Sequence, residues 1–269
     1  MKKPKNRQKY LDIMLIMAIF AGVSIVALFA WIVYADYLER KTVNYEPAAS
    51  SFVQVTEPTA TAAPPKTIAL PKNPVDFNDL SKQNQDLYAW IKVPNTIINY
   101  PVAQSAPDMP EDFYLESDIY KQYYFDGTIY TQKINSKNFD DPVTILYGHN
   151  LLNGTMFSQL HYFESEAFFD ENRYFYIYIR GRILKYYIFA AFDYDDRHIM
   201  YSFDFNKTDI FLNYLEETLN FNASNAFKRP PPAEFQPNDK IVILSTCSNI
   251  NSNGRYLVHG VLVDEEITT

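Results

Sequence analysis

Short apolar runs separated by polar turns recur along the chain after residue 86 and predict a protein built mainly from strands. The clearest run is Ile-Val-Ile-Leu at residues 241–244, which is β-branched at three of its four positions. It is too short for an ordinary helix and is typical of a buried strand. A polar loop follows, and the apolar segment at residues 256–263 then predicts a second strand. Residues 143–147 form a third run of the same kind, so we expect a sheet with an apolar centre.

Further strands and a few helices are predicted around these runs. The additional strands are residues 88–93 and 97–102 around a Pro94-Asn95 turn, residues 127–132, and a hairpin of residues 174–180 and 182–192 around Gly181. Helical spacing predicts a helix from Asp76 or Asn78 to Leu87, helical turns at residues 108–115 and 155–160, and a helix at residues 208–219 capped by Thr208. About eight strands with few, irregularly placed helices predict a mostly-β, closed or nearly closed barrel.

The N-terminal part of the chain has a different pattern. Residues 1–12 are basic, and residues 13–35 contain no charged side chain. A helix of that length extends about 35 Å, enough to cross a bilayer, and the preceding lysines place its N-terminus in the cytoplasm. A cleaved signal peptide is the alternative, although its apolar core is usually shorter. We therefore expect a transmembrane anchor at 13–35, a stalk and Pro/Ala/Thr-rich linker at 36–74, and a folded extracellular domain at 75–269.

Charge and cysteine content narrow the possible functions. The formal net charge is −8, and residues 1–35 carry five cations against Asp12, or +4, so the remainder is about −12. The acidic charge of residues 36–269 argues against nucleic-acid binding, which needs a basic surface. The single cysteine excludes an intramolecular disulfide, and an unpaired cysteine outside the cytoplasm is either buried filler or a reactive thiol. The chain has no Walker loop, dinucleotide fingerprint, HExxH motif or paired CxxC motif, so nucleotide and zinc chemistry are unsupported.

Cys247 is the first candidate for chemistry. It directly follows the run at 241–244 and Ser245-Thr246, while Arg255 opens the next predicted strand eight positions later. If these strands are neighbours, the loop between them brings a thiol and a guanidinium to the same edge of the sheet. That pairing suits acyl transfer. A buried structural cysteine and an ordinary strand-end arginine remain the alternatives.

His149 is the candidate partner of this thiol. It follows the apolar run at 143–147 and Gly148, and it precedes an Asn/Gly-containing loop. His161 and His198 lie in polar, aromatic-flanked segments. His259 lies mid-strand, as a structural histidine would. Cys–His catalysis needs an imidazole within hydrogen-bond reach of the thiol or the leaving group. A surface histidine is the alternative. The acidic residues Asp193, Asp195 and Asp196 lack a calcium-loop spacing, and a solvated face is favoured for them over a metal site.

These motifs resemble a known family. Leu-Ser-Thr-Cys at 244–247 followed by Arg255 resembles the signature of sortases, membrane-anchored cysteine transpeptidases of Gram-positive bacteria. Tyr-Gly-His-Asn at 147–150, the segment 153–157 and the segment 75–94 are similar to class B sortases in particular. Two positions depart from the family pattern. Ile243 replaces a usual threonine, and the segment 105–120, which lines the substrate groove in the family, matches only at Tyr114-Leu115.

The resemblance implies a closed eight-stranded sortase-type barrel over residues 75–269, with no cofactor and no metal. It implies that Cys247 attacks a sorting-signal carbonyl to form a thioester, that His149 exchanges protons with the leaving and incoming amines, and that Arg255 holds the oxyanion. It also implies Leu115, Ser245 and Thr246 as substrate-binding residues. The implied partners are surface proteins with a C-terminal sorting signal and a peptidoglycan-precursor or pilin amine. The alternatives are an L,D-transpeptidase-like or hydrolytic cysteine peptidase of the envelope, or a non-catalytic membrane-tethered binding domain.

Overall fold

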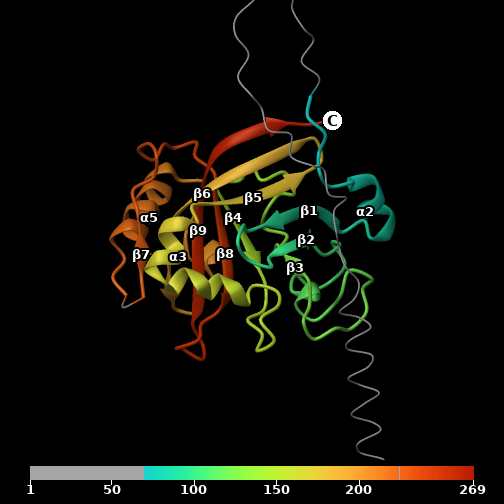
Figure 1. Cartoon of the computed structure of the whole chain (residues 1–269), viewed down its shortest axis with the longest axis horizontal. Coiled ribbons are helices and arrows are strands. Elements are labelled where there is room, and N and C mark those ends of the chain that lie inside the picture. The colour runs from blue at the N-terminus through green and yellow to red at the C-terminus, as the bar shows by residue number, and fades with distance from the viewer. Residues whose placement is uncertain (1–69, 224) are drawn as a thin grey trace, which may run out of the picture. The chain divides into compact units, whose positions relative to one another are not determined.

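Eight strands close into a ring in the computed structural model, which describes residues 70–223 and 225–269 (Figure 1). The order around the ring is β5-β1-β2-β3-β4-β8-β9-β6, and β6 pairs back with β5. A short β7 is added outside the ring on β6. The strands are β1 Leu87–Lys92, β2 Asn99–Ala103, β3 Ile129–Tyr130, β4 Val143–Tyr147, β5 Tyr174–Ile179, β6 Arg182–Tyr194, β7 Phe227–Lys228, β8 Ile241–Cys247 and β9 Arg255–Ile267. The predicted mostly-β, closed eight-stranded barrel is confirmed.

The centre of the sheet is made by β4, β8 and β9. β4 and β8 pair in parallel, with Tyr147 opposite Ser245, and β8 pairs antiparallel with β9. β4 and β8 are buried on both faces, as their unbroken apolar runs predict. Val242 and Leu244 belong to one hydrophobic cluster, and Ile241 and Ile243 belong to another. Because successive side chains point to opposite faces, β8 separates two cores.

The two longest strands close the ring. β5 and β6 form the predicted hairpin around Gly181, whose φ of +78° is a left-handed conformation that glycine adopts without strain. β6 and β9 pair along nearly their whole lengths, from Arg182 opposite Ile267 to Tyr194 opposite Arg255. β9 therefore extends past the predicted end at residue 263. Residues 264–266 are acidic and exposed, so an apolar pattern does not reveal them, but the ladder to β6 holds them in the strand.

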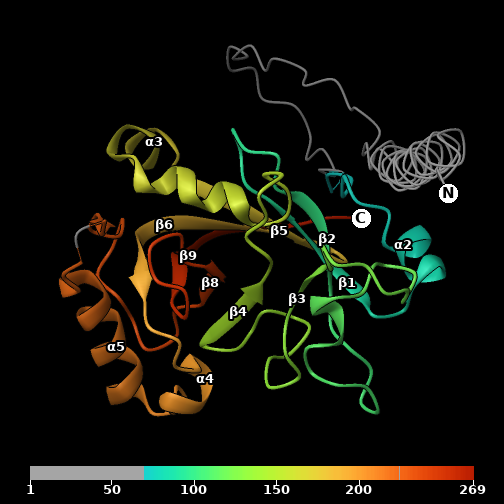
Figure 2. The ribbon, with the colours of Figure 1, turned by 90° about the horizontal axis from the view of Figure 1, so that it is seen from below.

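The helices lie outside the ring. They are α2 Phe77–Gln83, α3 Glu166–Glu171, α4 Ile199–Ser202 and α5 Thr208–Asn220, with 3-10 helices η1 Phe113–Leu115 and η2 Ser158–Glu164. α5 and α2 lie at opposite ends of the domain in both views (Figures 1 and 2). α5 packs Phe211, Tyr214 and Leu215 into the same core as Ile241 and Ile243. α3, α4 and β7 have no clear periodicity in the sequence because each is a few residues long.

Several helix boundaries differ from the sequence prediction: the turns predicted at 108–115 and 155–160 are the 3-10 helices η1 and η2, and two further differences have a visible cause. The first helix begins after the predicted cap Asp76 but ends at Gln83, and Leu87 belongs to β1. The cause is a tertiary contact: the buried Asn84 is extended, and its amide donates to the Tyr114 hydroxyl (2.6 Å) and the Ile119 carbonyl (3.0 Å). In α5 the N-cap is Lys207, whose carbonyl accepts from the Phe211 amide, so Thr208 is already helical and does not cap.

The predicted membrane anchor at residues 13–35 lies outside the described residues. Across 70–223 and 225–269, none of the helices combines the length and apolar character needed to cross a membrane.

Candidate active site

The register of the central strands brings three predicted residues to one rim of the barrel. Cys247 is the last residue of β8 and lies directly opposite Arg255, the first residue of β9. β4 ends at Tyr147, opposite Ser245, and the Gly148 amide still donates to the Ser245 carbonyl (3.1 Å). His149 follows two residues after the end of β4 and lines the same cavity as Cys247 and Arg255. The facing pair on β8 and β9 and the residue just after β4 therefore meet at one rim.

A cavity of about 350 Å³ opens over this area. Ile145 and Leu257 line it from the core side, and Tyr130 and Tyr147, stacked with ring centroids 5.4 Å apart, contribute an aromatic wall. Burial raises the pKa of both tyrosines, with nearby Arg255 acting in the opposite direction, so their hydroxyls stay protonated at neutral pH. All six predicted site residues line this one cavity: Leu115, His149, Ser245, Thr246, Cys247 and Arg255.

The thiol is exposed, although the rest of its strand is buried. Residues 241–246 are all buried, and Cys247 alone in β8 reaches solvent. The alternative of a buried structural cysteine is therefore not what the fold contains. Exposure at the mouth of a cavity is the setting that a reactive thiol requires.

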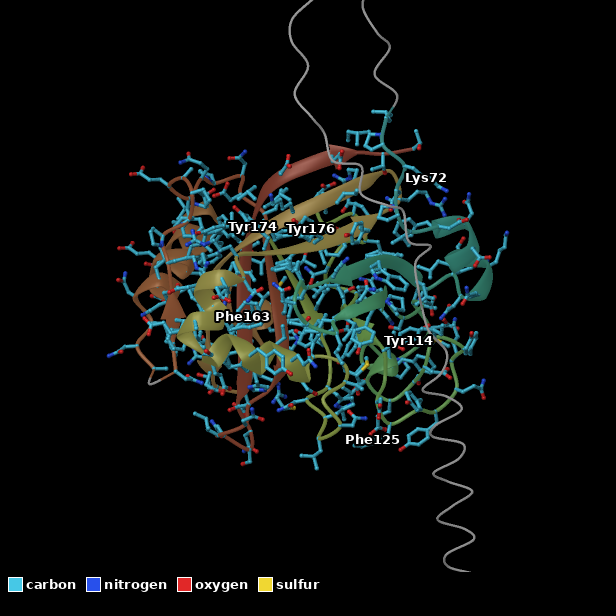
Figure 3. The ribbon with its side chains drawn as sticks, viewed as in Figure 1. Lys72, Tyr114, Phe125, Phe163, Tyr174 and Tyr176 are labelled. Atoms are coloured by element: carbon cyan, nitrogen blue, oxygen red, sulfur yellow. The ribbon has the colours of Figure 1, made fainter. Side chains whose placement is uncertain are left out.

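The imidazole of His149 is held by a backbone carbonyl. Nε2 lies 2.8 Å from the carbonyl oxygen of Leu115, and a carbonyl only accepts, so Nε2 carries a proton. Phe125 stacks on the ring at 5.7 Å between centroids. Figure 3 shows Phe125 at the lower edge of the domain. Leu115 thus contacts the site through its main chain as well as lining the cavity, a role that a side-chain motif does not reveal.

Arg255 is anchored on its own loop. Its Nη1 donates to the carbonyls of Asn253 (3.2 Å) and Gly254 (3.1 Å), and the side chain is half-buried. These two bonds orient the guanidinium at the cavity that Cys247 and His149 share.

The other three histidines lie in different environments. His259 is fully buried, its Nε2 lies 3.0 Å from the Tyr214 hydroxyl, and burial lowers its pKa to about 3. His198 lines the cavity, with Nε2 2.6 Å from the Gln132 side-chain oxygen. His161 contacts the main chain of Cys247, with Nε2 2.9 Å from its carbonyl oxygen. Sequence reasoning did not find this contact, which joins residues 86 positions apart.

Two of the three acidic residues at the end of β6 bond to other side chains. Arg197 donates to both carboxylate oxygens of Asp195, at 2.6–2.9 Å, and these bonds lower the pKa of Asp195. Asp193 accepts from the Asn225 amide. Within the described part of the chain, no group of three or more acidic, histidine or cysteine residues is arranged to hold a metal ion.

Comparisons with known proteins found a matching family and similar structures. The family described as Sortase domain matches residues 91–263. The chain is 26% identical to sortase B of Staphylococcus aureus over 234 residues, covering 86% of this chain and 88% of that protein. The crystal structure of Clostridium perfringens sortase B superposes with a TM-score of 0.63 at 31% identity, covering 70% of this chain and 100% of that one. A class B sortase of Streptococcus pyogenes involved in pilus biogenesis gives 0.57 at 26% identity, covering 70% and 98%.

Proposed function

The chain belongs to the sortase family, and from this premise we propose that it cleaves the C-terminal sorting signal of surface proteins through a thioester on Cys247. Its solved relatives are class B sortases, and membership makes the chain a cysteine transpeptidase. The observation that carries the assignment of residues is the rim itself. The exposed thiol of Cys247 lies opposite Arg255, and His149 lines the same cavity.

Each side chain has one role in the proposed reaction. Cys247 loses its proton to His149, and its sulfur attacks the carbonyl carbon of the scissile peptide bond. The negative charge then develops on the carbonyl oxygen, where the Arg255 guanidinium stabilises it. His149 returns the proton to the departing amine, which leaves the thioester behind. Since Nε2 of His149 is held by the Leu115 carbonyl, Nδ1 is the nitrogen proposed to exchange protons.

The second half of the reaction reverses these transfers. An acceptor amine loses a proton to His149 and attacks the thioester carbon, and the Cys247 sulfur leaves and recovers that proton. We propose a peptidoglycan-precursor amine or a pilin amine as the acceptor, and Leu115, Ser245 and Thr246 as contacts of the sorting signal, because all three line the cavity. The uncharged segment 13–35 supports a single-pass anchor, with the N-terminus cytoplasmic and the catalytic domain outside, held away from the membrane by residues 36–74.

Mass spectrometry of the full-length protein in detergent, mixed with a panel of sorting-signal peptides, tests this proposal. We expect a peptide adduct on Cys247 in the wild type and none in Cys247→Ala, with the fold unchanged by circular dichroism. His149→Ala should form the adduct about 10²–10⁴-fold more slowly, the usual contribution of general acid–base catalysis. An adduct that still forms in Cys247→Ala at wild-type rate would contradict the thiol mechanism. A His149 loss of about tenfold or less would assign the proton transfers elsewhere.

Adding amines to the same reaction distinguishes transpeptidation from hydrolysis. A short glycine peptide or a diaminopimelate-type amine should convert slow hydrolysis into ligation, and the ratio of ligated to hydrolysed peptide should rise with amine concentration. A ratio that stays near zero at saturating amine, with fast hydrolysis throughout, would identify a cysteine peptidase on this scaffold.

A further inference from the structure

The carbonyl of Cys247 lies where the parallel ladder between β4 and β8 has already ended. The Ser245 carbonyl accepts from the Gly148 amide (3.1 Å). Carbonyls of alternate residues in a strand point the same way, so the Cys247 carbonyl points to the side that β4 occupies lower down. β4 ends at Tyr147, however, and the chain turns away into the loop that leads to η2. The peptide after the nucleophile therefore needs a different partner.

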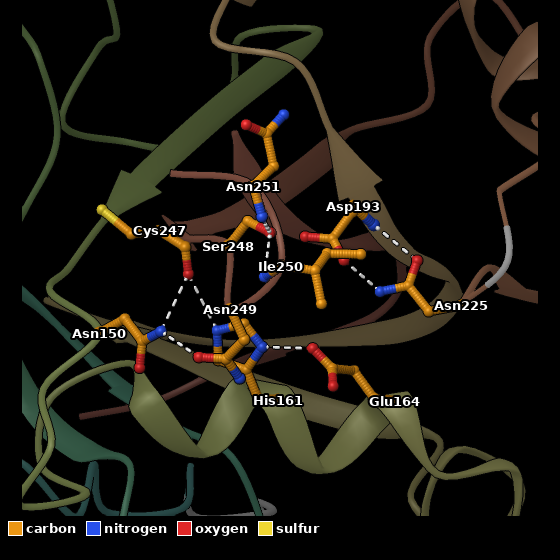
Figure 4. Close-up of polar contacts among 10 residues, drawn as sticks. All are labelled: Asn150, His161, Glu164, Asp193, Asn225, Cys247, Ser248, Asn249, Ile250 and Asn251. Atoms are coloured by element: carbon orange, nitrogen blue, oxygen red, sulfur yellow. Dashed lines mark hydrogen bonds and ion pairs between the residues drawn. The ribbon is translucent and has the colours of Figure 1, made fainter. Parts of the chain in front are cut away.

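Two side chains take the place of the missing strand. Asn150 Nδ2 donates to the Cys247 carbonyl at 3.1 Å, and Nε2 of His161 lies 2.9 Å from the same oxygen (Figure 4). Asn150 also donates to the Asn249 side chain (2.8 Å), so it ties down the loop that follows the cysteine. His161 comes from η2, whose Leu160 and Phe163 are buried in the hydrophobic core of the barrel.

His161 is itself held on two sides. Its Nδ1 lies 2.5 Å from a carboxylate oxygen of Glu164, its ring lies against Tyr256 with centroids 4.8 Å apart, and its side chain is only 8% exposed. Both hydrogen-bond partners of the ring are acceptors. The contact with the Cys247 carbonyl therefore requires a proton on Nε2, and the Glu164 carboxylate holds the ring at Nδ1. Such an arrangement fixes the ring and favours donation to Cys247.

The loop between the two histidines connects this contact to the proposed acid–base residue. The Phe157 amide donates to the His149 carbonyl (3.0 Å), and Asn150 bridges to Met156, so the loop returns on itself before η2 begins. His149 thus stands at the start of this loop, facing the cavity, and His161 follows its end, bonded to the main chain of Cys247.

We propose that His161, oriented by Glu164, is a positioning residue for transpeptidation: it locks the Cys247–Ser248 peptide and so fixes the thiol against His149 and Arg255. The inference rests on the proposed role of Cys247 as nucleophile. Cys247 is the last residue of its strand, and the residues after it form a self-bonded loop, in which the Ser248 hydroxyl accepts from the amides of Ile250 and Asn251. Without His161, Asn150 alone holds this carbonyl from that side, and the loop and the thiol can shift together.

The expected consequence is a loss of alignment rather than of thiol chemistry. A displacement of about 1 Å at a reacting group costs about 10²-fold in rate. In the full-length protein, we therefore expect H161A to slow single-turnover thioester formation about 10²-fold with an unchanged KM. H161Q, whose amide can still donate to the Cys247 carbonyl, should recover a large part of that loss. Alkylation of Cys247 by iodoacetamide needs no alignment with His149 or Arg255 and should keep its wild-type rate in both variants.

Glu164 should act only through His161. E164A releases the ring and should lower acylation by about tenfold, a smaller misalignment than H161A produces, while H161A/E164A should be no slower than H161A alone. E166Q removes a carboxylate of the same kind two positions away, on an exposed side chain, and should behave as wild type. If H161A does not fold, as judged by its unfolding midpoint, H161Q and E164A decide the question by the same comparison of acylation with alkylation.

Different results overturn different claims. Wild-type protein that forms no thioester with any peptide overturns the proposed function and this inference with it. A wild-type thioester with undiminished acylation in H161A and E164A overturns the inference alone. Equal losses of acylation and alkylation in the variants also overturn it, because His161 would then govern the thiol's reactivity or the fold and not its alignment.

Discussion

Arg255 directs only part of its guanidinium to its own loop. Nη1 donates to the carbonyls of Asn253 and Gly254, and within residues 70–223 and 225–269 the other guanidinium nitrogens have no such bond. The planar fork therefore has donors fixed to the protein on one side and donors facing the cavity on the other. A lysine has a single nitrogen on a flexible stem and cannot satisfy both sides in the same way.

We expect Arg255→Lys to lose about 10²–10³-fold in kcat/KM, the usual cost of removing one oxyanion donor. Steady-state cleavage of a sorting peptide gives the measurement. Arg180→Lys is the matched control, because Arg180 donates to Asn78 and Phe77 at the α2 end of the domain. If Arg255→Lys keeps most of its activity, the residue contributes only its charge.

Burial of His259 predicts how the stability of the fold depends on pH. Its pKa is about 3 in the fold, against an ordinary value of 6.5, because burial disfavours the charged ring. Between these two pH values the unfolded chain binds more protons than the folded one, so stability is complete above pH 6.5 and falls as the pH falls. The loss is on the order of 1.4 kcal/mol for each pH unit inside this window.

His259→Phe should therefore unfold with a shallower dependence on pH between 6.5 and 5 than the wild type, as followed by thermal denaturation. Phenylalanine suits the site, because Phe189 and Phe192 already pack against the ring. Tyr214→Phe is the control: it removes the hydroxyl that contacts Nε2 but retains the titrating ring, so it should keep the wild-type slope. Identical slopes in His259→Phe and the wild type would show that other groups cause the acid sensitivity.

At the scale of elements, the sequence predicted what is local. β4, β8 and the β5–β6 hairpin follow from apolar runs and Gly181, and the parallel pairing of β4 with β8 puts the strand before His149 next to the strand that ends at Cys247. What could not be predicted depends on contacts distant in sequence. The hydrogen bond from the Asn84 side chain to Tyr114 ends α2. His161 on η2 contacts the main-chain carbonyl of Cys247. The His-x-x-Glu spacing of His161 and Glu164 was visible, but nothing in the sequence related it to Cys247.

The end of β4 depends on a close approach that only glycine permits. A Cβ placed on Gly148 would lie 2.4 Å from Ile129 Cδ1 on β3 and 2.9 Å from the buried ring of Phe157. Gly148 immediately precedes His149, so β3 and the loop before η2 are packed tightly against the backbone that delivers the proposed acid–base residue.

Gly148→Ala should cost about 1–3 kcal/mol of unfolding free energy, as overpacking usually does, and should lower activity more than stability alone explains. Chemical denaturation and peptide cleavage measure the two effects. The Ile129→Val change removes the methyl group at the shortest contact, so the double variant should be more stable than the sum of the single changes predicts. Simple additivity would mean that the clash with Ile129 is not what destabilises Gly148→Ala.

At the scale of the whole molecule, the start and end of the described fold are tied together. The Thr269 amide donates to the Pro71 carbonyl (3.0 Å), and the buried Asn73 donates from Nδ2 to the Ile179 carbonyl (2.9 Å) and the Thr268 hydroxyl (3.2 Å). Asn73 thereby joins the segment before α2 to the turn of the β5–β6 hairpin and to the end of β9. The fold accordingly includes residues upstream of position 75, where the apolar pattern begins, because hydrogen bonds and not apolar side chains hold them.

Removing the N-terminal segments should therefore yield an active domain whose stability depends on where the cut is made. We expect residues 70–269 to be soluble, active and about 1–3 kcal/mol more stable than residues 75–269, since a buried hydrogen bond contributes about 0.5–1.5 kcal/mol and the shorter form lacks the two buried bonds that the Asn73 amide donates. Urea denaturation measures the difference, and Asn73→Ala in residues 70–269 should reproduce most of it. Equal stability of the two forms would mean that these contacts do not contribute to the free energy of unfolding. Loss of activity in both would mean that residues 36–69 take part in the catalytic domain.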